Sequence, residues 1–335
     1  MSSLKIAVVG LGLGRHFVRT LAGHPDVDCL ILCDADADRS EEVRQAHPEV
    51  SAIYEQLEVM LEKERPDAVF VVTPDHLHRP HSTLCMESGS HVLQTKPLAT
   101  NLDDARAIVA SSSATGKKLM VAHERRFRPQ CQRVKALIEE GEIGDLIHLR
   151  VDAIADKRGQ FKRAPWYASP EAGRSALNGT GIHEVDLIRY YTGRPIEAVS
   201  AFGNRLGGLD FPKDKTTAAV FRFEGDVIGQ VTVTYEAQQP RGKHIDDHLR
   251  IVGTEGTIIG DRLYRVGEED WEDLSGHSHD IRAGLQGAVL AFVDSLVNDT
   301  PIAVTGEDAF DSLAAADAAD QSAARGEILR PESLK

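Results

Sequence analysis

The chain has 335 residues, of which 41% are hydrophobic, so it can bury a large core and is long enough for two domains. Lysine and arginine number 38 against 52 aspartate and glutamate residues, and the formal net charge of −14 argues against a polyanionic partner such as nucleic acid. The four cysteines lie within or beside apolar runs without Cys-x-x-Cys spacing, and no apolar stretch approaches the length of a membrane span. We therefore expect a cytoplasmic protein with buried thiols, no leader segment and no membrane contact, which binds small ligands.

The chain begins with an apolar, β-branched run at residues 5–9, which ends in a glycine-rich loop and passes into a helix-like segment at residues 15–22. Gly10 and Gly12 would let the backbone approach a pyrophosphate, whose charge the N–H groups of the helix start would stabilise. A second apolar strand ends in Asp34, at about the usual distance from the loop for the acid that binds the adenosine ribose. Together these features predict a dinucleotide site, whereas the loop alone would also fit an ordinary βαβ turn.

Strands and helices continue to alternate as far as His123. We expect strands at residues 29–33, 67–73, 91–94 and 118–122, and helices at residues 38–46, 83–88 and 101–111. This alternation predicts a parallel, doubly wound sheet in a first domain of residues 1–123.

The second half changes character, and a second domain of residues 124–335 is expected to bind substrate and to form oligomers. We expect strands at residues 147–155, 198–206, 218–223, 227–237 and 248–259, with adjacent strands antiparallel. Two late helices, residues 284–297 and 308–325, are expected to cover this sheet, with packing back on the first domain as an alternative. Because these helices can cover only one face, the other face is expected to meet another subunit in a homodimer or homotetramer.

Several motifs, taken together, resemble those of the glucose–fructose oxidoreductase, inositol dehydrogenase and rhizopine-catabolism (Gfo/Idh/MocA) family over nearly the whole chain. Besides the glycine loop they are Thr73-Pro74-Asp75-x-x-His78, Lys96-Pro97, Arg126-Phe127-x-Pro129, Gly181-x-His183-x-x-Asp186, Gly253-Thr-Glu-Gly256 and Thr305-Gly-Glu-Asp308. The resemblance implies an α/β protein with an N-terminal Rossmann domain and a C-terminal α/β domain that has an open, mainly antiparallel sheet. It also implies NAD(P)-dependent hydride transfer between a sugar, cyclitol or related polyol and nicotinamide.

The resemblance also implies the site residues. Those expected to bind the cofactor are Gly10, Gly12, Gly14, Arg15, Asp34, Arg39, Thr73, Pro74, His78 and Lys96. Those expected to bind substrate are Lys96, His123, Arg125, Trp166, Asn178 and His183. We expect NAD, because a carboxylate at Asp34 suits a ribose 2′-hydroxyl and repels a 2′-phosphate, while Arg15 and Arg39 keep NADP open as an alternative.

Lys96 and His183 are the predicted catalytic residues. Lys96 precedes a proline and so lies in a loop at the carboxyl end of a strand, where its ammonium could hold the reacting oxygen of the substrate. His183 opens a helical pattern with Asp186 on the same face, which fits a general base and also fits a core histidine satisfied by that aspartate. The histidines at positions 76, 78 and 81 lack an acidic or thiol ligand set, so no metal site is expected.

Trp166 and Tyr167 precede the His183 helix and follow three cationic residues, Lys157, Arg158 and Arg163. Aromatic faces and cationic side chains suit polyhydroxylated or acidic ligands, so this segment fits a wall of the substrate pocket. It fits a packing loop equally well.

Three positions depart from the family pattern. Arg15 takes the third glycine position with Gly14 one place early, Thr95 replaces the glutamate before Lys96, and Gly179 replaces an aspartate four residues before His183. A full Lys-Asp-His set is therefore absent. This absence gives more weight to two alternatives to the dehydrogenase: an NAD-tethered glycosidase or lyase acting through transient oxidation, or a non-catalytic nucleotide-sensing regulator.

Overall fold

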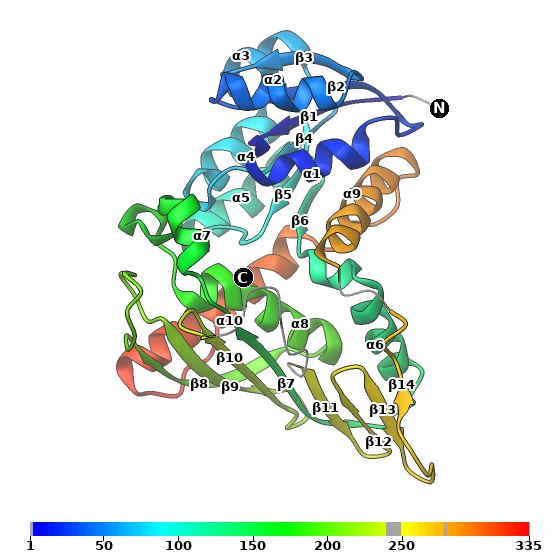
Figure 1. The fold of residues 1–335 in the computed structure, drawn as a ribbon, viewed down its shortest axis with the longest axis vertical. Coiled ribbons are helices and arrows are strands. Elements are labelled where there is room, and N and C mark those ends of the chain that lie inside the picture. The colour runs from blue at the N-terminus through cyan, green and yellow to red at the C-terminus, as the bar shows by residue number, and fades with distance from the viewer. Residues whose placement is uncertain (1–2, 239–248, 278–279, 335) are drawn as a thin grey trace. The chain divides into compact units, whose positions relative to one another are not determined.

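The computed structural model describes residues 3–238, 249–277 and 280–334 (Figure 1). By its internal contacts the chain divides into two units, of which the first comprises Met1–Phe127 with Ile281–Phe310 and the second comprises Arg128–Asp280 with Asp311–Lys335. Among the described residues, no helix is both long enough and apolar enough to cross a bilayer.

The first unit is built on a six-stranded sheet in the order β3-β2-β1-β4-β5-β6, and all of its strand pairs are parallel. The bounds are β1 (Leu4–Val9), β2 (Val27–Cys33), β3 (Val50–Tyr54), β4 (Ala68–Val71), β5 (His91–Thr95) and β6 (Leu119–Ala122). From β1 the chain adds β2 and β3 on one side of the sheet and then β4, β5 and β6 on the other side. The topological switch point therefore lies between β1 and β4. The predicted doubly wound Rossmann sheet is confirmed.

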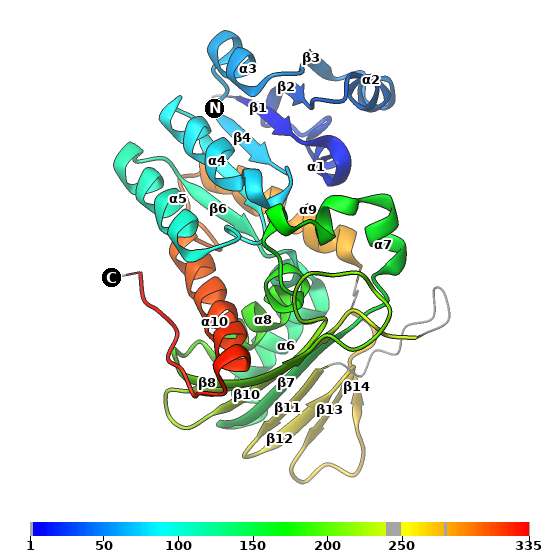
Figure 2. The same cartoon turned by 90° about the vertical axis from the view of Figure 1, so that its left-hand side faces the viewer.

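Helices cover both faces of this sheet. They are α1 (Leu11–Leu21), α2 (Ala37–Ala46), α3 (Leu57–Glu64), α4 (His78–Glu87), α5 (Leu102–Thr115) and α9 (Ile281–Val297). Figure 2 shows α4 and α5 on one side of the strands and α1 with α9 on the other.

Helix α9 was expected to cover the second sheet, with packing back on the first domain as an alternative, and the alternative is confirmed. Phe292 of α9 packs edge-on against Phe70 of β4, with ring centroids 5.6 Å apart, and Phe70 in turn packs against Phe17 of α1 at 6.1 Å. Leu285 and Val289 of α9 lie in the same buried core. The apolar pattern of a helix does not show which sheet the helix covers. In this chain α9 packs beside α1 on the first sheet.

The second unit contains an eight-stranded sheet in the order β14-β13-β12-β11-β7-β10-β9-β8. The bounds are β7 (Leu146–Ile154), β8 (Ile196–Asn204), β9 (Thr216–Phe223), β10 (Ile228–Thr234), β11 (Leu249–Gly253), β12 (Gly256–Ile259), β13 (Arg262–Arg265) and β14 (Glu272–Asp273). The expected single strand at residues 248–259 is two strands, because a turn at Thr254 and Glu255 separates β11 from β12; residue 248 lies outside the described residues.

Most of this sheet is antiparallel, as expected, but β7 and β10 at its centre are parallel, which corrects the prediction for that pair. After β7 the chain passes through α7 (Arg158–Arg163) and α8 (Ile182–Thr192) to the edge strand β8. Such a helical crossover makes β8 run parallel to β7, and the two turns that follow reverse the chain twice. The third strand of that meander, β10, therefore runs alongside β7 in the same direction.

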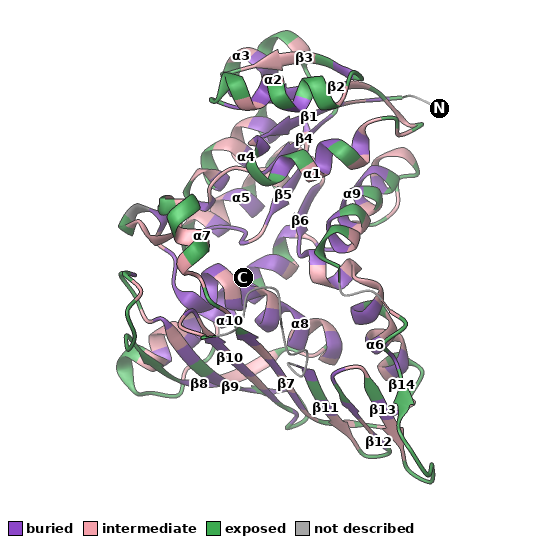
Figure 3. Cartoon of the chain, in the orientation of Figure 1, coloured by how far each residue is buried: buried purple, intermediate pink, exposed green. Residues whose placement is uncertain are grey.

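One face of the second sheet is covered by α6 (Pro129–Glu139), α8 and α10 (Gly306–Arg325), as Figure 2 shows. Buried and exposed residues alternate along β9, and Figure 3 colours the chain by burial. Phe221 and Phe223 of β9 are fully buried and lie in one core with residues of α6, α8 and α10. Ala315 and Ala319 of α10 lie in the same core. Beyond α10, Leu329 exchanges backbone hydrogen bonds with Val199 and so pairs with the edge strand β8.

Candidate functional site

The turn between β1 and α1 requires glycine at its first position. Gly10 has φ +88°, and a Cβ placed there would lie 2.6 Å from the carbonyl oxygen of Val72. At Gly12 a Cβ would meet nothing within 4 Å, so this side of the loop is open. No acidic residue occupies the first turn of α1, whose N–H groups can therefore receive an anion. The loop fits the pyrophosphate of a dinucleotide.

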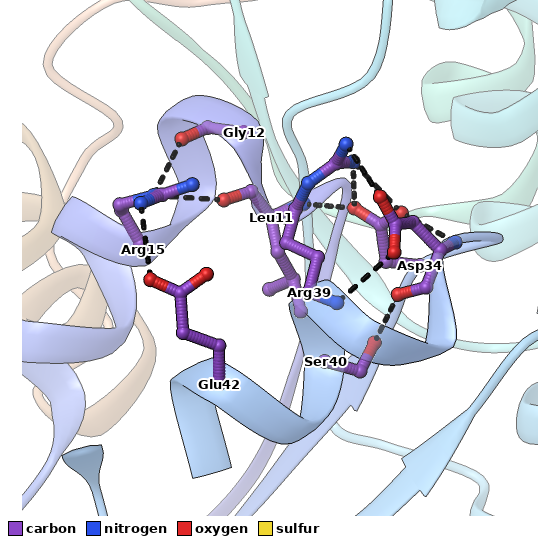
Figure 4. A network of polar contacts seen from close by, with 8 residues as sticks. Leu11, Gly12, Arg15, Asp34, Arg39, Ser40 and Glu42 are labelled. Atoms are coloured by element: carbon purple, nitrogen blue, oxygen red, sulfur yellow. Dashed lines mark hydrogen bonds and ion pairs between the residues drawn. The ribbon is translucent and has the colours of Figure 1, made fainter. Parts of the chain in front are cut away.

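Gly14 performs the packing role of the missing third glycine. A Cβ at Gly14 would lie 3.0 Å from Cγ1 of Val8 and 3.6 Å from Cβ of Val72, so α1 approaches the sheet closely at this point. Arg15, which occupies the usual third-glycine position, is exposed, and its Nε donates to the carbonyl oxygen of Gly12 at 3.1 Å (Figure 4). The shift of the glycine by one residue therefore repacks the loop and keeps its close helix–strand contact.

Asp34 is held at the carboxyl end of β2, beside the glycine loop (Figure 4). The N–H of Leu11 donates to its Oδ2 at 2.6 Å, the N–H of Asp36 donates to its Oδ1 at 2.9 Å, and Nη1 of Arg39 lies 3.1 Å from both oxygens. Arg39 also pairs with Asp36 at 2.9 Å. An ionised carboxylate has about four lone-pair positions, and these four contacts use them, so a ribose hydroxyl would bind Asp34 by replacing one of the two Arg39 contacts.

His78 connects the loops that follow β4 and β5. Its Nδ1 lies 2.7 Å from the carbonyl oxygen of Pro97, its Nε2 lies 3.1 Å from the carbonyl oxygen of Thr73, and its side chain is fully buried. Gln94 donates from Nε2 to Leu98 at 2.7 Å and so fixes the second loop further. The Lys96–Pro97 peptide is cis. His78 thus holds the position of the segment that carries Lys96.

The first unit brings several predicted site residues to one edge of its sheet. Thr73 and Pro74 follow β4, Lys96 follows β5, and His123 follows β6, so all lie at the carboxyl ends of adjacent parallel strands. This is the edge at which ligands bind in open α/β sheets. His123 is buried and Arg125 is half-buried; next to them Arg126 pairs with Asp308 at 2.5 Å.

The second unit contains the other predicted residues, Trp166, Asn178 and His183. His183 lies in the first turn of α8, directly after a π-helical turn over Leu177–Gly181 that includes Asn178. Asp186, one turn further on, is buried and accepts a hydrogen bond from Ser312 of α10 at 3.0 Å. Asp186 therefore anchors α8 to α10.

Arg174 is a buried cation that the sequence analysis missed. Its Nη2 donates to the carbonyl oxygen of Gly179, and its guanidinium carbon lies 4.6 Å from the ring centroid of Tyr167 and 5.5 Å from that of Trp166. The two rings stack on each other at 3.9 Å. The signal that could have revealed it is an arginine shortly before a glycine that stands in an acidic position of the family pattern.

The parallel sheet, the glycine loop and Asp34 define an NAD-binding Rossmann protein, and the added mixed sheet restricts the class further. Residues 4–123 match the family model described as an oxidoreductase family with an NAD-binding Rossmann fold, and residues 131–259 match the GFO/IDH/MocA C-terminal domain. The chain belongs to the Gfo/Idh/MocA family and is an NAD-binding oxidoreductase.

The chain is similar to several characterised proteins. It is 28% identical over 263 residues to D-apiose dehydrogenase of Paraburkholderia graminis, and the aligned region covers 78% of this chain and 68% of the relative. It is 29% identical over 275 residues to 1,5-anhydro-D-fructose reductase of Ensifer adhaerens, which covers 80% of each. An oxidoreductase from Agrobacterium radiobacter, solved with NAD+, L-tartaric acid and magnesium, shares the fold with a TM-score of 0.87 at 23% identity over 98% of both chains.

Proposed function

We propose that the protein is an NAD-dependent dehydrogenase that transfers hydride between a hydroxyl-bearing carbon of a sugar, cyclitol or related polyol and nicotinamide. The observation that carries this proposal is the position of Lys96, which follows the strand next to Thr73 on the sheet edge that bears the glycine loop. D-apiose dehydrogenase, 1,5-anhydro-D-fructose reductase and an inositol 2-dehydrogenase of Saccharopolyspora erythraea are relatives of the chain and support this substrate class.

In this proposal the first unit holds the cofactor. Gly10, Gly12 and the N–H groups at the start of α1 receive the pyrophosphate, and Asp34 accepts the adenosine ribose hydroxyls. Thr73, Pro74 and Lys96 line the nicotinamide end of the site. His78 contributes indirectly, because it holds the two loops that carry these residues. Bound NAD supplies a nicotinamide ring that accepts or donates hydride.

Lys96 and His183 carry the proton chemistry of the proposed reaction. The ammonium of Lys96 stabilises the negative charge that develops on the reacting oxygen, and His183 removes the hydroxyl proton as general base. His123, Arg125, Trp166 and Asn178 are proposed to contact substrate. Lys96 belongs to the first unit and His183 to the second.

A substrate screen tests the proposal. Purified protein with NAD is mixed with sugars, cyclitols and their acids, and absorbance of the reduced nicotinamide is followed. We expect NADH to accumulate with at least one compound. Cleavage of a glycoside or another C–O bond without net NADH would support an NAD-tethered glycosidase or lyase instead. Binding of NAD without turnover of any compound, together with capture of a specific protein partner, would support a nucleotide-sensing regulator.

We also propose that the protein works in the cytoplasm as a homodimer or homotetramer. Cys29, Cys33, Cys85 and Cys131 are free thiols, and burial raises the pKa of Cys33 to about 12, which suits inert thiols in a reducing compartment. The outer face of the second sheet exposes apolar side chains, including Phe202, Val220 and Ile228. This face suits association of two copies.

A further inference from the structure

We propose that Arg174 takes the place of the family aspartate beside His183 and makes this enzyme select substrates that carry a carboxylate, such as sugar acids or carboxylated cyclitols. The inference rests on the proposed dehydrogenase function and specifies its substrate class. Its starting point is the position of the Arg174 guanidinium relative to Gly179.

The guanidinium occupies the space that a side chain at position 179 would fill. A Cβ built on Gly179 would lie 2.6 Å from Nε of Arg174 and 3.0 Å from its Nη2. Position 179 lies about one helical turn before His183, and residues four apart in a helix lie on one face. The guanidinium of Arg174 therefore occupies the position at which the family pattern has a carboxylate.

The exchange inverts the hydrogen-bonding chemistry of the position as well as its charge. An ionised aspartate only accepts hydrogen bonds, so it recognises the hydroxyl donors of a neutral polyol. A guanidinium only donates, and its planar fork matches the two oxygens of a carboxylate. A site with this donor set consequently favours a substrate that presents an anionic acceptor group.

The surroundings fix the guanidinium in one orientation. Arg174 is only 6% exposed, its guanidinium carbon lies 4.6 Å from the Tyr167 ring, and its Nη2 donates to Gly179. Trp166 stacks on the face of the Tyr167 ring and so restricts its movement. A cation held on aromatic faces loses less conformational freedom when it binds a ligand. The aromatic segment thus positions Arg174 for recognition.

The first experiment measures binding of matched pairs to the NADH-saturated enzyme by titration calorimetry. Suitable pairs are D-gluconate with D-glucitol, D-glucuronate with D-glucose, and D-galacturonate with D-galactose. We expect at least one acid to bind about 10-fold or more tightly than its neutral parent, the size of a charge-assisted hydrogen bond. Equal or tighter binding of every parent, or failure of all acids to bind at about 10 mM ligand, overturns the proposal.

Variants separate recognition from a purely structural role. Arg174→Gln should reduce the ratio of acid affinity to parent affinity to near one, and Arg174→Lys should retain part of it. Equal losses for acid and parent would indicate a structural role and contradict the proposal. The double variant Gly179→Asp with Arg174→Ala restores the family arrangement and should shift preference to the neutral parent. If Arg174→Gln fails to fold, Arg174→Lys still tests recognition, and equal or tighter binding of the parents by the natural enzyme still overturns the proposal.

The same compounds distinguish failure of this inference from failure of the proposed function. Tight binding of acids without NADH formation from any compound would contradict the dehydrogenase function and support the carboxylate site. Turnover confined to neutral sugars would support the dehydrogenase and overturn the carboxylate site.

Discussion

Gly14 lies one residue before the usual third glycine of the nucleotide-binding loop and still provides the close contact between helix and sheet. The motif spacing places Arg15 in the third glycine position, and the sequence therefore predicts a shortened or repacked loop. In the structure Gly14 faces Val8 and Val72, so the close contact of α1 with the sheet is preserved. The physical requirement is a small residue where the helix comes closest to the sheet. The usual spacing between the glycines of the motif is one way to meet this requirement, and a glycine one residue earlier meets it here.

Asp34 carries a prediction about cofactor choice. Its carboxylate accepts ribose hydroxyls but repels a 2′-phosphate, so we expect the natural protein to bind NAD more tightly than NADP. Asp34→Ala should remove most of this preference, because Arg39 then loses its contact with the carboxylate that follows β2 and can turn toward a phosphate. Titration with both nucleotides, followed by protein fluorescence, measures the effect.

The matched control is Asp36→Ala, which removes another carboxylate that contacts Arg39 but leaves Asp34 beside the loop. This variant should keep the preference for NAD. Tighter binding of NADP by the natural protein would contradict the prediction.

Lys96 and His183 carry a prediction about turnover. Loss of a general base or of a group that stabilises developing charge typically lowers rates by about 10²- to 10⁴-fold. Lys96→Ala and His183→Ala should each lower kcat by this factor with the best substrate of the screen, while NAD affinity changes far less. Steady-state kinetics and NAD titration provide the two measurements. If both variants keep near-natural kcat, the reacting groups lie elsewhere.

Helix α10 contains an acid whose ionisation should affect stability. Burial raises the pKa of Asp320 to about 6 from an ordinary value of 3.8, and a hydrogen bond from Ser175 and the charge of Lys213 oppose the increase; the carboxylates of Asp317 and Asp214 add to it. The folded protein thus binds this proton more tightly than the unfolded chain does. The free energy of unfolding should therefore fall as the pH rises from about 4 to about 6.

Asp320→Asn should remove that loss. Above about pH 6 the variant should gain up to about 3 kcal/mol in free energy of unfolding, since one pKa unit corresponds to about 1.4 kcal/mol, and below about pH 4 the gain should vanish. Urea denaturation at several pH values measures the difference. Asp210→Asn, which changes an exposed aspartate in the same unit, is the control and should show little effect at any pH. A gain that does not depend on pH would contradict the assignment to Asp320.

For two elements the sequence predicted the segment but not how that segment packs. The strand β10 and the helix α9 were predicted as segments, but the direction of β10 relative to β7 was wrong, and α9 packs on the sheet that was given only as an alternative. A strand's alternating pattern describes its two faces and says nothing about the direction of its neighbour. Pairing of β10 with β7 follows from the crossover through α7 and α8, which is a property of the whole unit.

At the scale of the whole molecule, the uncovered face of the second sheet predicts self-association. Phe202 is 80% exposed, Ile154 51%, Ile228 44% and Val220 42%, and strand alternation places all four on the face opposite α6, α8 and α10. Burial of such side chains against a second copy is favourable by about 25 cal/mol per Å² of apolar area. We expect light scattering at micromolar concentration to give the mass of a dimer or tetramer.

The double variant Phe202→Glu with Val220→Glu should produce monomers, because like charges on neighbouring strands would then be buried at the contact without compensation. Val266→Lys changes an apolar residue that is 72% exposed just beyond β13, and it should leave the mass unchanged. A monomeric mass for the natural protein that persists on dilution would contradict self-association through this face.

The sequence by itself determined the alternation of strands and helices, the glycine loop with Asp34, and the start of α10, where the N–H of Asp308 donates to the Thr305 hydroxyl at 3.2 Å. These features depend on residues close together in the chain, whose local pattern and capping chemistry are readable without the fold. The tertiary structure alone decided that α9 packs on the first sheet, that β7 and β10 are parallel, and that Arg174 fills the space beside Gly179. Each of these depends on contacts between segments that a linear pattern does not specify, because a side chain's partner is set by the packing of the whole unit.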